Sequence, residues 1–120
     1  MNTDIKAEWV AELRSGKFPQ GARYLLADER YCCLGVLCEI ALRHDVPLEV
    51  RKVRQSGALA DVEVVTSFDG LESALPSVVS QWADVSEFGN APAYTNDSLA
   101  WRNDNGESFE QIADYIEENM

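Results

Sequence analysis

The most apolar stretch of the chain spans residues 31–42. On a helix that begins near Cys33, apolar side chains occupy positions nearly all round the axis, and Glu39 is the one charged residue of the stretch. Such a helix is stable in water only when other elements cover most of its circumference. The pattern therefore predicts a central core helix over residues 33–43.

An amphipathic helix is predicted at each end of the chain. Apolar residues recur every four positions between residues 5 and 13, after Thr3, which is expected to cap the first helix. Residues 108–118 carry a second apolar stripe, and Ser108 and Gln111 form a capping box at its start. Both helices are expected to bury one face and expose the other.

Shorter patterns between these helices predict a small sheet. Residues 22–26 and 30–32 form a candidate β-hairpin that leads straight into the central helix. Residues 61–68 have strand composition, and Pro76 is expected at the first position of a short helix. Residues 84–97 contain Gly, Pro, Asn and Asp and are expected to form a loop.

These elements predict an α+β fold, with about four helices around a small antiparallel sheet. The 120 residues, 46% of them hydrophobic and 26% charged, suit a single globular domain over residues 1–120 that needs no disulfide or metal. The first residues are charged, and no run approaches the roughly 20 apolar residues of a membrane span. We therefore expect a cytoplasmic protein whose three cysteines are reduced thiols.

The net charge of −11 is unevenly distributed. Residues 1–55 contain nine Lys and Arg against eight Asp and Glu, whereas residues 56–120 contain only Arg102 against thirteen acids. An acidic surface of this kind repels nucleic acid and anionic membranes and attracts basic partners. The alternative is that the acids simply keep a small protein soluble.

The cysteines favour packing over catalysis. Cys33 lies at the start of a predicted helix, where the helix dipole can activate a thiol. The one histidine, His44, is eleven residues further along that helix, which is on the order of 16 Å at 1.5 Å per residue. The spacing of Cys33, Cys38 and His44 also lacks the pattern of a zinc site. Neither a metal nor a cofactor is predicted.

A small-ligand site is the second interpretation. Residues 49–54 form the one basic cluster, on a strand edge or an exposed loop. A nucleotide-like ligand could be held by the basic side chains with an aromatic ring as a stacking platform. The sequence does not place these groups together, and the tryptophans also suit core packing. The candidate residues are Arg51, Lys52, Arg54, Tyr94 and Trp101.

Two patterns resemble those of small proteins encoded by bacteriophages and prophages. The first joins Trp9, residues 13–17, Gln20-Gly21 and the Tyr-Cys-Cys-Leu-Gly-Val-Leu-Cys run of residues 31–38. The second joins Leu99-Ala100, Asn103-Asp104, Gly106, Ser108-Phe109, Ile112-Ala113 and Ile116-Glu117, preceded by Leu75-Pro76 and Trp82. Residues 45–74 are unmatched. The resemblance implies a phage origin and a cytoplasmic accessory role, and it carries no activity.

The leading hypothesis is a binding protein that antagonises a host protein with a basic surface, such as a nucleic-acid-binding or defence component. No direct contact with nucleic acid or membrane is expected. The C-terminal helix carries no base to offset its acids, which favours it as the contact surface. A cysteine-dependent hydrolase is a third class. The predicted partner-binding residues are Asp97, Asp104, Glu110, Asp114, Glu117 and Glu118.

Overall fold

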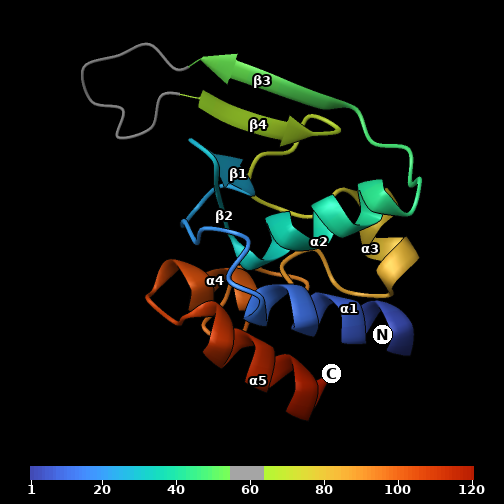
Figure 1. The fold of residues 1–120 in the computed structure, drawn as a ribbon, viewed down its shortest axis with the longest axis vertical. Helices are drawn as coiled ribbons and strands as arrows, with labels where there is room; N and C mark the ends of the chain where they lie inside the picture. Colours follow the sequence, from blue (N-terminus) through green and yellow to red (C-terminus); the bar gives the residue numbers. More distant parts are fainter. Residues whose placement is uncertain (55–63) are drawn as a thin grey trace.

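Helix α2 (Cys33–Arg43) lies at the centre of the molecule, between the sheet and the remaining helices (Figure 1). The computed structural model describes residues 1–54 and 64–120. Eight residues of α2 are buried, on every side of its axis. The prediction of a core helix over residues 33–43 is therefore confirmed.

Within the described residues, four short strands form an antiparallel sheet in the order β2-β1-β4-β3. A tight turn joins the first two strands, and β4 pairs with both β1 and β3. Residues in register form rows across the sheet, one of which contains Tyr31, Leu26, Thr66 and Lys52. The strands are β1 (Leu26–Ala27), β2 (Arg30–Tyr31), β3 (Val50–Arg54) and β4 (Val64–Phe68).

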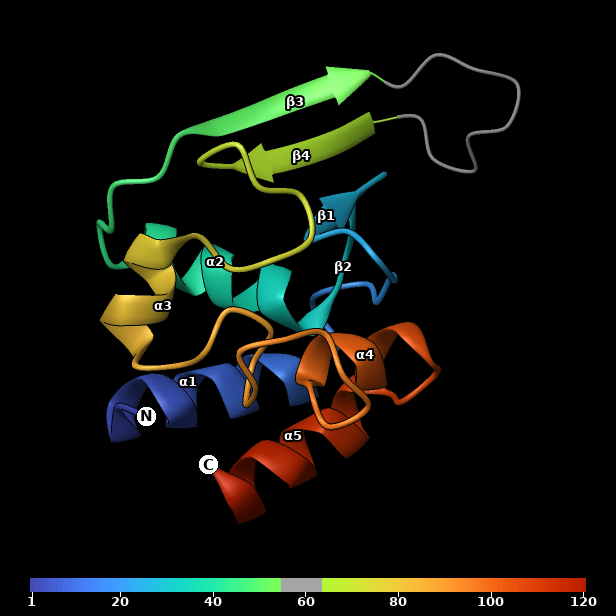
Figure 2. The ribbon, with the colours of Figure 1, turned by 180° about the vertical axis from the view of Figure 1, so that it is seen from behind.

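The helices lie mainly below the sheet in Figure 1, in two levels. Helix α2 is nearest the sheet, and α1 and α5 run antiparallel at the far end of the molecule, as Figure 2 also shows. The other described helices are α1 (Thr3–Arg14), α3 (Ser77–Ala83), α4 (Leu99–Asp104) and α5 (Phe109–Asn119).

The α+β class and the single domain are confirmed, with five helices in residues 1–54 and 64–120 where about four were predicted. The Cα radius of gyration of 13.4 Å agrees with the value of about 13.6 Å expected for one compact domain of this length. One core cluster gathers buried residues from α1 to α5.

Two close contacts fix α2 in place. A Cβ atom on Gly35 would lie 1.8 Å from the carbonyl oxygen of Leu25, so only glycine permits this approach of the helix to the preceding segment. On another side, the indole Nε1 of the fully buried Trp9 donates a hydrogen bond of 2.9 Å to the carbonyl oxygen of Cys33. Helix α1 is thereby tied to the first turn of α2.

Two predicted helix starts are shifted by one residue. Asn2, and not Thr3, caps α1, because its Oδ1 accepts hydrogen bonds of 3.0 Å from the backbone N–H groups of residues 4 and 5. Pro76 is the N-cap of α3 and not its first helical residue. Its extended ψ of 147° leaves its carbonyl to accept from the N–H groups of Val79 and Ser80. The capping box of Ser108 and Gln111 is confirmed.

The predicted hairpin exists with shorter strands. Its loop is the pair Asp28-Glu29, both with positive φ, the geometry of a two-residue hairpin turn. Arg23 also has a positive φ of 75°, which prevents residues 22–25 from forming an extended strand. In the predicted strand over residues 61–68, Val64–Phe68 forms β4, and residues 61–63 lie outside the described residues.

Replacing Gly35 by Ala tests the packing of α2. In an exposed helix this change commonly stabilises, by about 1 kcal/mol. Here the new methyl group meets backbone atoms of Leu25, so we expect the free energy of unfolding to fall by about 1–3 kcal/mol. Urea denaturation followed by circular dichroism measures the change. A midpoint equal to or above that of the wild type would contradict the packing described.

Candidate functional site

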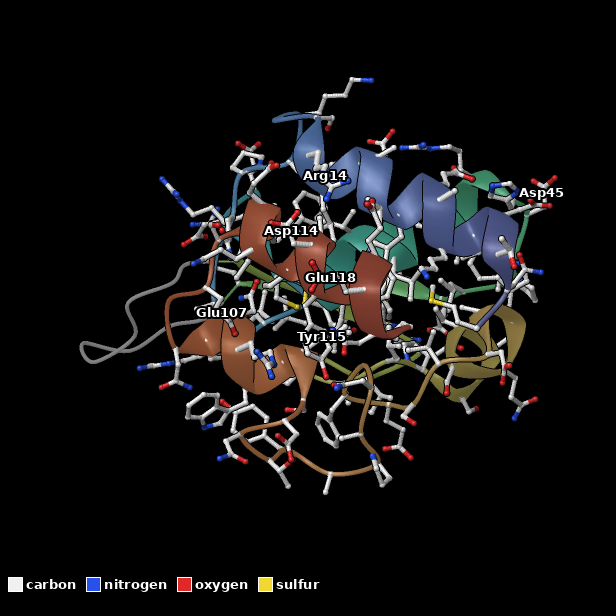
Figure 3. All side chains as sticks on the ribbon, turned by 90° about the horizontal axis from the view of Figure 1, so that it is seen from below. Arg14, Asp45, Glu107, Asp114, Tyr115 and Glu118 are labelled. Carbon is white, nitrogen blue, oxygen red and sulfur yellow. The ribbon has the colours of Figure 1, made fainter. Side chains whose placement is uncertain are left out.

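Helices α1 and α5 share a cluster of ion pairs centred on Arg14, in the last turn of α1 (Figure 3). Its guanidinium lies 2.6 Å from Asp114 Oδ1, 2.7 Å from Glu117 Oε2 and 3.6 Å from Glu110 Oε1. Hydrogen bonds to Glu117 and then to Asp114 raise the pKa of Arg14. The interpretation that no base offsets the α5 acids is therefore wrong, because the base comes from another helix.

The α1–α5 layer nevertheless remains acidic. Helix α5 contains four acids and no base, and α1 contains three acids and two bases, so their charges of −4 and −1 give −5. The side chains of Glu110, Asp114 and Glu117 are 66%, 58% and 58% exposed in spite of their contacts with Arg14. We call Glu110, Asp114, Glu117 and Glu118 the acidic face.

The two remaining acids of the predicted surface differ in role. Asp104, at the end of α4, accepts hydrogen bonds from the backbone N–H of Arg23 at 2.6 Å and from the Tyr94 hydroxyl at 2.7 Å. Desolvation and, to a smaller extent, the hydrogen bond to Asp104 raise the pKa of Tyr94 to about 12. Asp104 therefore connects three segments of the chain, whereas Asp97 is exposed, next to the Ser98 cap of α4.

The residues of the predicted small-ligand site are not brought together. Arg51, Lys52 and Arg54 lie on β3, at one end of the molecule, whereas Tyr94 and Trp101 belong to the α4 region on the other side of α2 (Figures 1 and 2). Arg51 pairs with Glu49. The proposed combination of basic cluster and stacking ring is therefore contradicted by the fold.

An open cavity of about 650 Å³ does include Lys52. Lys52 and Tyr31 line it beside the carboxylates of Asp28 and Glu29. Two carboxylates against one ammonium group make this lining unsuitable for a phosphate-bearing ligand. The remaining lining residues are Leu26, Val64 and Thr66.

All three cysteines are buried, as predicted. Burial is the largest cause that raises the pKa of each thiol, that of Cys32 to about 12. For Cys32 and Cys33 it outweighs the opposing effect of the backbone amides at the start of α2. His44 lies just beyond the other end of α2, with its Nε2 2.7 Å from Glu8 Oε1. No thiol is therefore paired with the imidazole as a nucleophile requires.

A partly buried amide network joins the helix ends, and the sequence analysis missed it. Asn103 Oδ1 accepts from the Cys33 N–H at 3.2 Å and from Gln20 Nε2 at 3.0 Å, while its Nδ2 donates to the carbonyl of Gly21. Gln20 Oε1 accepts from the Phe109 N–H at 3.1 Å. The sequence hinted at this network only in that Gln20-Gly21 and Asn103 fall within the two phage-like patterns. The network is structural.

The charges define two opposite ends of the molecule. Strand β3 contains two Arg, one Lys and no acid, a charge of +3, and lies at the upper end of the 42 Å axis in Figure 1. The α1–α5 layer, with its charge of −5, lies at the lower end. Strand β3 can therefore attract an acidic partner, and the α1–α5 layer can attract a basic one.

The family model of a domain of unknown function (DUF8296) matches residues 1–120. No curated protein and no solved structure matches the chain. Among the helices of residues 1–54 and 64–120, none has the length and apolar character needed to cross a bilayer. The same residues contain no group of three or more His, Cys, Asp or Glu side chains placed to hold a metal ion.

Replacing Arg14 by Met tests the ion-pair cluster. Without the guanidinium, the α5 carboxylates repel one another, so the melting temperature should fall. Added NaCl screens that repulsion and should restore part of the loss. Arg51→Met, which removes an exposed pair with Glu49 only, should change the melting temperature far less. Equal effects of the two changes, or a loss that grows with salt, would contradict the role of Arg14.

Thiol labelling tests the burial of the cysteines. Because burial raises the pKa of all three thiols, iodoacetamide at pH 8 should react only after the chain opens. We expect labelling of the native protein to be roughly a hundredfold slower than labelling in concentrated urea. Mass spectrometry counts the modified cysteines. Rapid single labelling at Cys33 would instead indicate an accessible, activated thiol.

Proposed function

The chain belongs over its whole length to the family of a domain of unknown function, DUF8296. Because the family assigns no activity, we propose a function from the surface of the chain itself. It is a binding protein that engages a partner with a basic surface through the acidic face of α5. It occupies that partner and thereby antagonises it. The proposal rests on the exposed carboxylates of α5, which Arg14 holds in place.

The acidic face suits binding because it is held in place before the partner arrives. Arg14 fixes three of the carboxylates, and Lys6 Nζ donates to the backbone carbonyl of Glu117 at 3.3 Å. A preorganised surface loses little conformational entropy on association. The negative potential also increases the rate of encounter with a basic partner and makes that rate dependent on salt.

The partner proposed is a host protein that itself binds nucleic acid or takes part in defence, and the setting is the cytoplasm of a phage-infected cell. The phage-like patterns of the sequence support this setting. Carboxylates presented at the phosphate-binding surface of such a host protein would compete with nucleic acid for the same basic residues. The chain itself, at −11, would not contact nucleic acid.

A capture experiment with matched variants tests the proposal. The first variant combines Glu110→Gln, Asp114→Asn and Glu118→Gln, which removes three charges but keeps the ion pair of Arg14 with Glu117. Charge reversal at Glu110 and Asp114 is avoided, since it would place lysines beside Arg14 and disturb the fold. The tagged protein is incubated with host lysate at low and at high salt, and bound proteins are identified by mass spectrometry.

The control variant removes three charges elsewhere, by Glu29→Gln, Glu72→Gln and Glu87→Gln. We expect the wild type and the control to retain one stoichiometric basic partner that is released as salt increases. The acidic-face variant should lose this partner while its melting temperature stays close to that of the control. Equal retention by both variants would overturn the proposed surface.

A further inference from the structure

Strand β3 forms an edge of the sheet. In the part of the chain that the structure describes, β3 pairs with β4 on one side and is the last strand in the order. All five of its residues are exposed, including the apolar Val50 at 42% and Val53 at 54%. A strand edge of this length presents a row of backbone groups to which another extended chain can pair.

The phase of the ladder identifies the backbone groups that point away from β4. The Asp69 N–H donates to the Glu49 carbonyl oxygen at 2.8 Å, so Glu49 faces β4. Residues alternate in an antiparallel ladder, and Arg51 and Val53 therefore also face β4. On the opposite side of β4, the Asp28 N–H donates to the carbonyl oxygen of Val64 at 2.9 Å, which agrees with this phase.

Val50, Lys52 and Arg54 consequently direct their N–H and C=O groups outward from the sheet. These residues are spaced as a partner strand of about six residues requires. Their side chains share one face of β3, while those of Arg51 and Val53 lie on the other. Lys52 and Arg54 therefore place two positive charges on one face of the edge, whereas Arg51 on the other face is paired with Glu49.

We propose that this outer edge of β3 binds an extended acidic segment of a partner protein, which adds to the sheet as a further strand. The outward backbone groups of Val50, Lys52 and Arg54 supply the hydrogen bonds. Acidic side chains on one face of the added segment then lie beside Lys52 and Arg54, and opposite charges on neighbouring strands stabilise pairing. The selection of an acidic segment follows from the two positive charges of Lys52 and Arg54, which form no ion pair within the described residues.

Charge also argues against two other occupants. Antiparallel pairing of β3 with β3 of a second copy, centred on Lys52, would place two Lys52 side chains opposite each other and bring two strands of charge +3 together. A nucleic acid would need basic groups aligned along one surface, whereas Arg51 lies on the opposite face from Lys52 and Arg54. The net charge of −11 also opposes the binding of a nucleic acid.

This second surface lies at the opposite end of the long axis from the acidic face (Figure 1). A segment bound at β3 therefore leaves the acidic face free. The two contacts differ in the sign of the charge that they recognise, so variants of one do not alter the other. Failure of either proposal would leave the other standing.

A synthetic peptide of alternating Val and Glu, six residues long with blocked ends, serves as the probe. Hydrogen exchange of the backbone amides is followed by NMR. Without peptide, the amides of Val50, Lys52 and Arg54 should exchange fast and those of Arg51 and Val53 slowly. Added peptide should protect the first three. Binding without that protection, or no binding at about 1 mM peptide, would overturn the proposal.

Variants of peptide and protein separate strand addition from simple charge attraction. A peptide N-methylated at every residue has no N–H donor on either edge and should not bind, and neither should the unmethylated peptide with Lys in place of Glu. Lys52→Glu should weaken binding roughly tenfold or more, whereas Lys17→Glu, the same charge change in a loop, should leave it unchanged. Equal weakening by both variants, or tighter binding of a single-stranded oligonucleotide than of the peptide, would reject the site.

Discussion

The requirement that α2 be covered on all sides determines the rest of the structure. Its side chains are apolar around the whole axis, and each exposed position would lose hydrophobic stabilisation. The sheet, α1, α3 and α4 meet this requirement from different directions. The approach of the Leu25 backbone to Gly35 and the hydrogen bond from Trp9 then set the distance of the helix from two of these neighbours.

The N–H groups at the start of α2 need a hydrogen-bond acceptor that the neighbouring side chain of Cys32 does not supply. Cys32, at the N-cap position, makes no side-chain capping hydrogen bond, and Asn103 from α4 supplies an acceptor for the N–H of Cys33. Asn103 also binds Gln20, which in turn binds the N–H of Phe109 at the start of α5. The position of the acidic face is thus linked, through the side-chain amides of Asn103 and Gln20, to the core helix.

Local sequence patterns correctly predicted the elements that neighbouring residues in the sequence stabilise. The core helix over residues 33–43 and the capping box at Ser108 follow from neighbouring residues and are confirmed. The contacts that depend on distant residues could not be predicted in this way: Arg14 with the α5 acids, Asp104 with Tyr94, and Asn103 with Cys33. The small-ligand combination was wrong for the same reason, because no local pattern places β3 relative to α4. The strands of the hairpin were predicted too long, since the positive φ of Arg23 arises from its tertiary setting.

The proposed function depends on the carboxylates that α5 and Arg14 hold at the surface, with the cysteines as packing residues. Zero-length carbodiimide cross-linking of the chain with its captured partner tests this claim most directly, because the reagent joins a carboxylate to a lysine in contact with it. Peptide mass spectrometry then identifies the joined residues. We expect amide bonds from partner lysines to Glu110, Asp114, Glu117 or Glu118. Cross-links confined to the acids of the loops around α3, such as Glu72 and Glu87, would contradict this expectation.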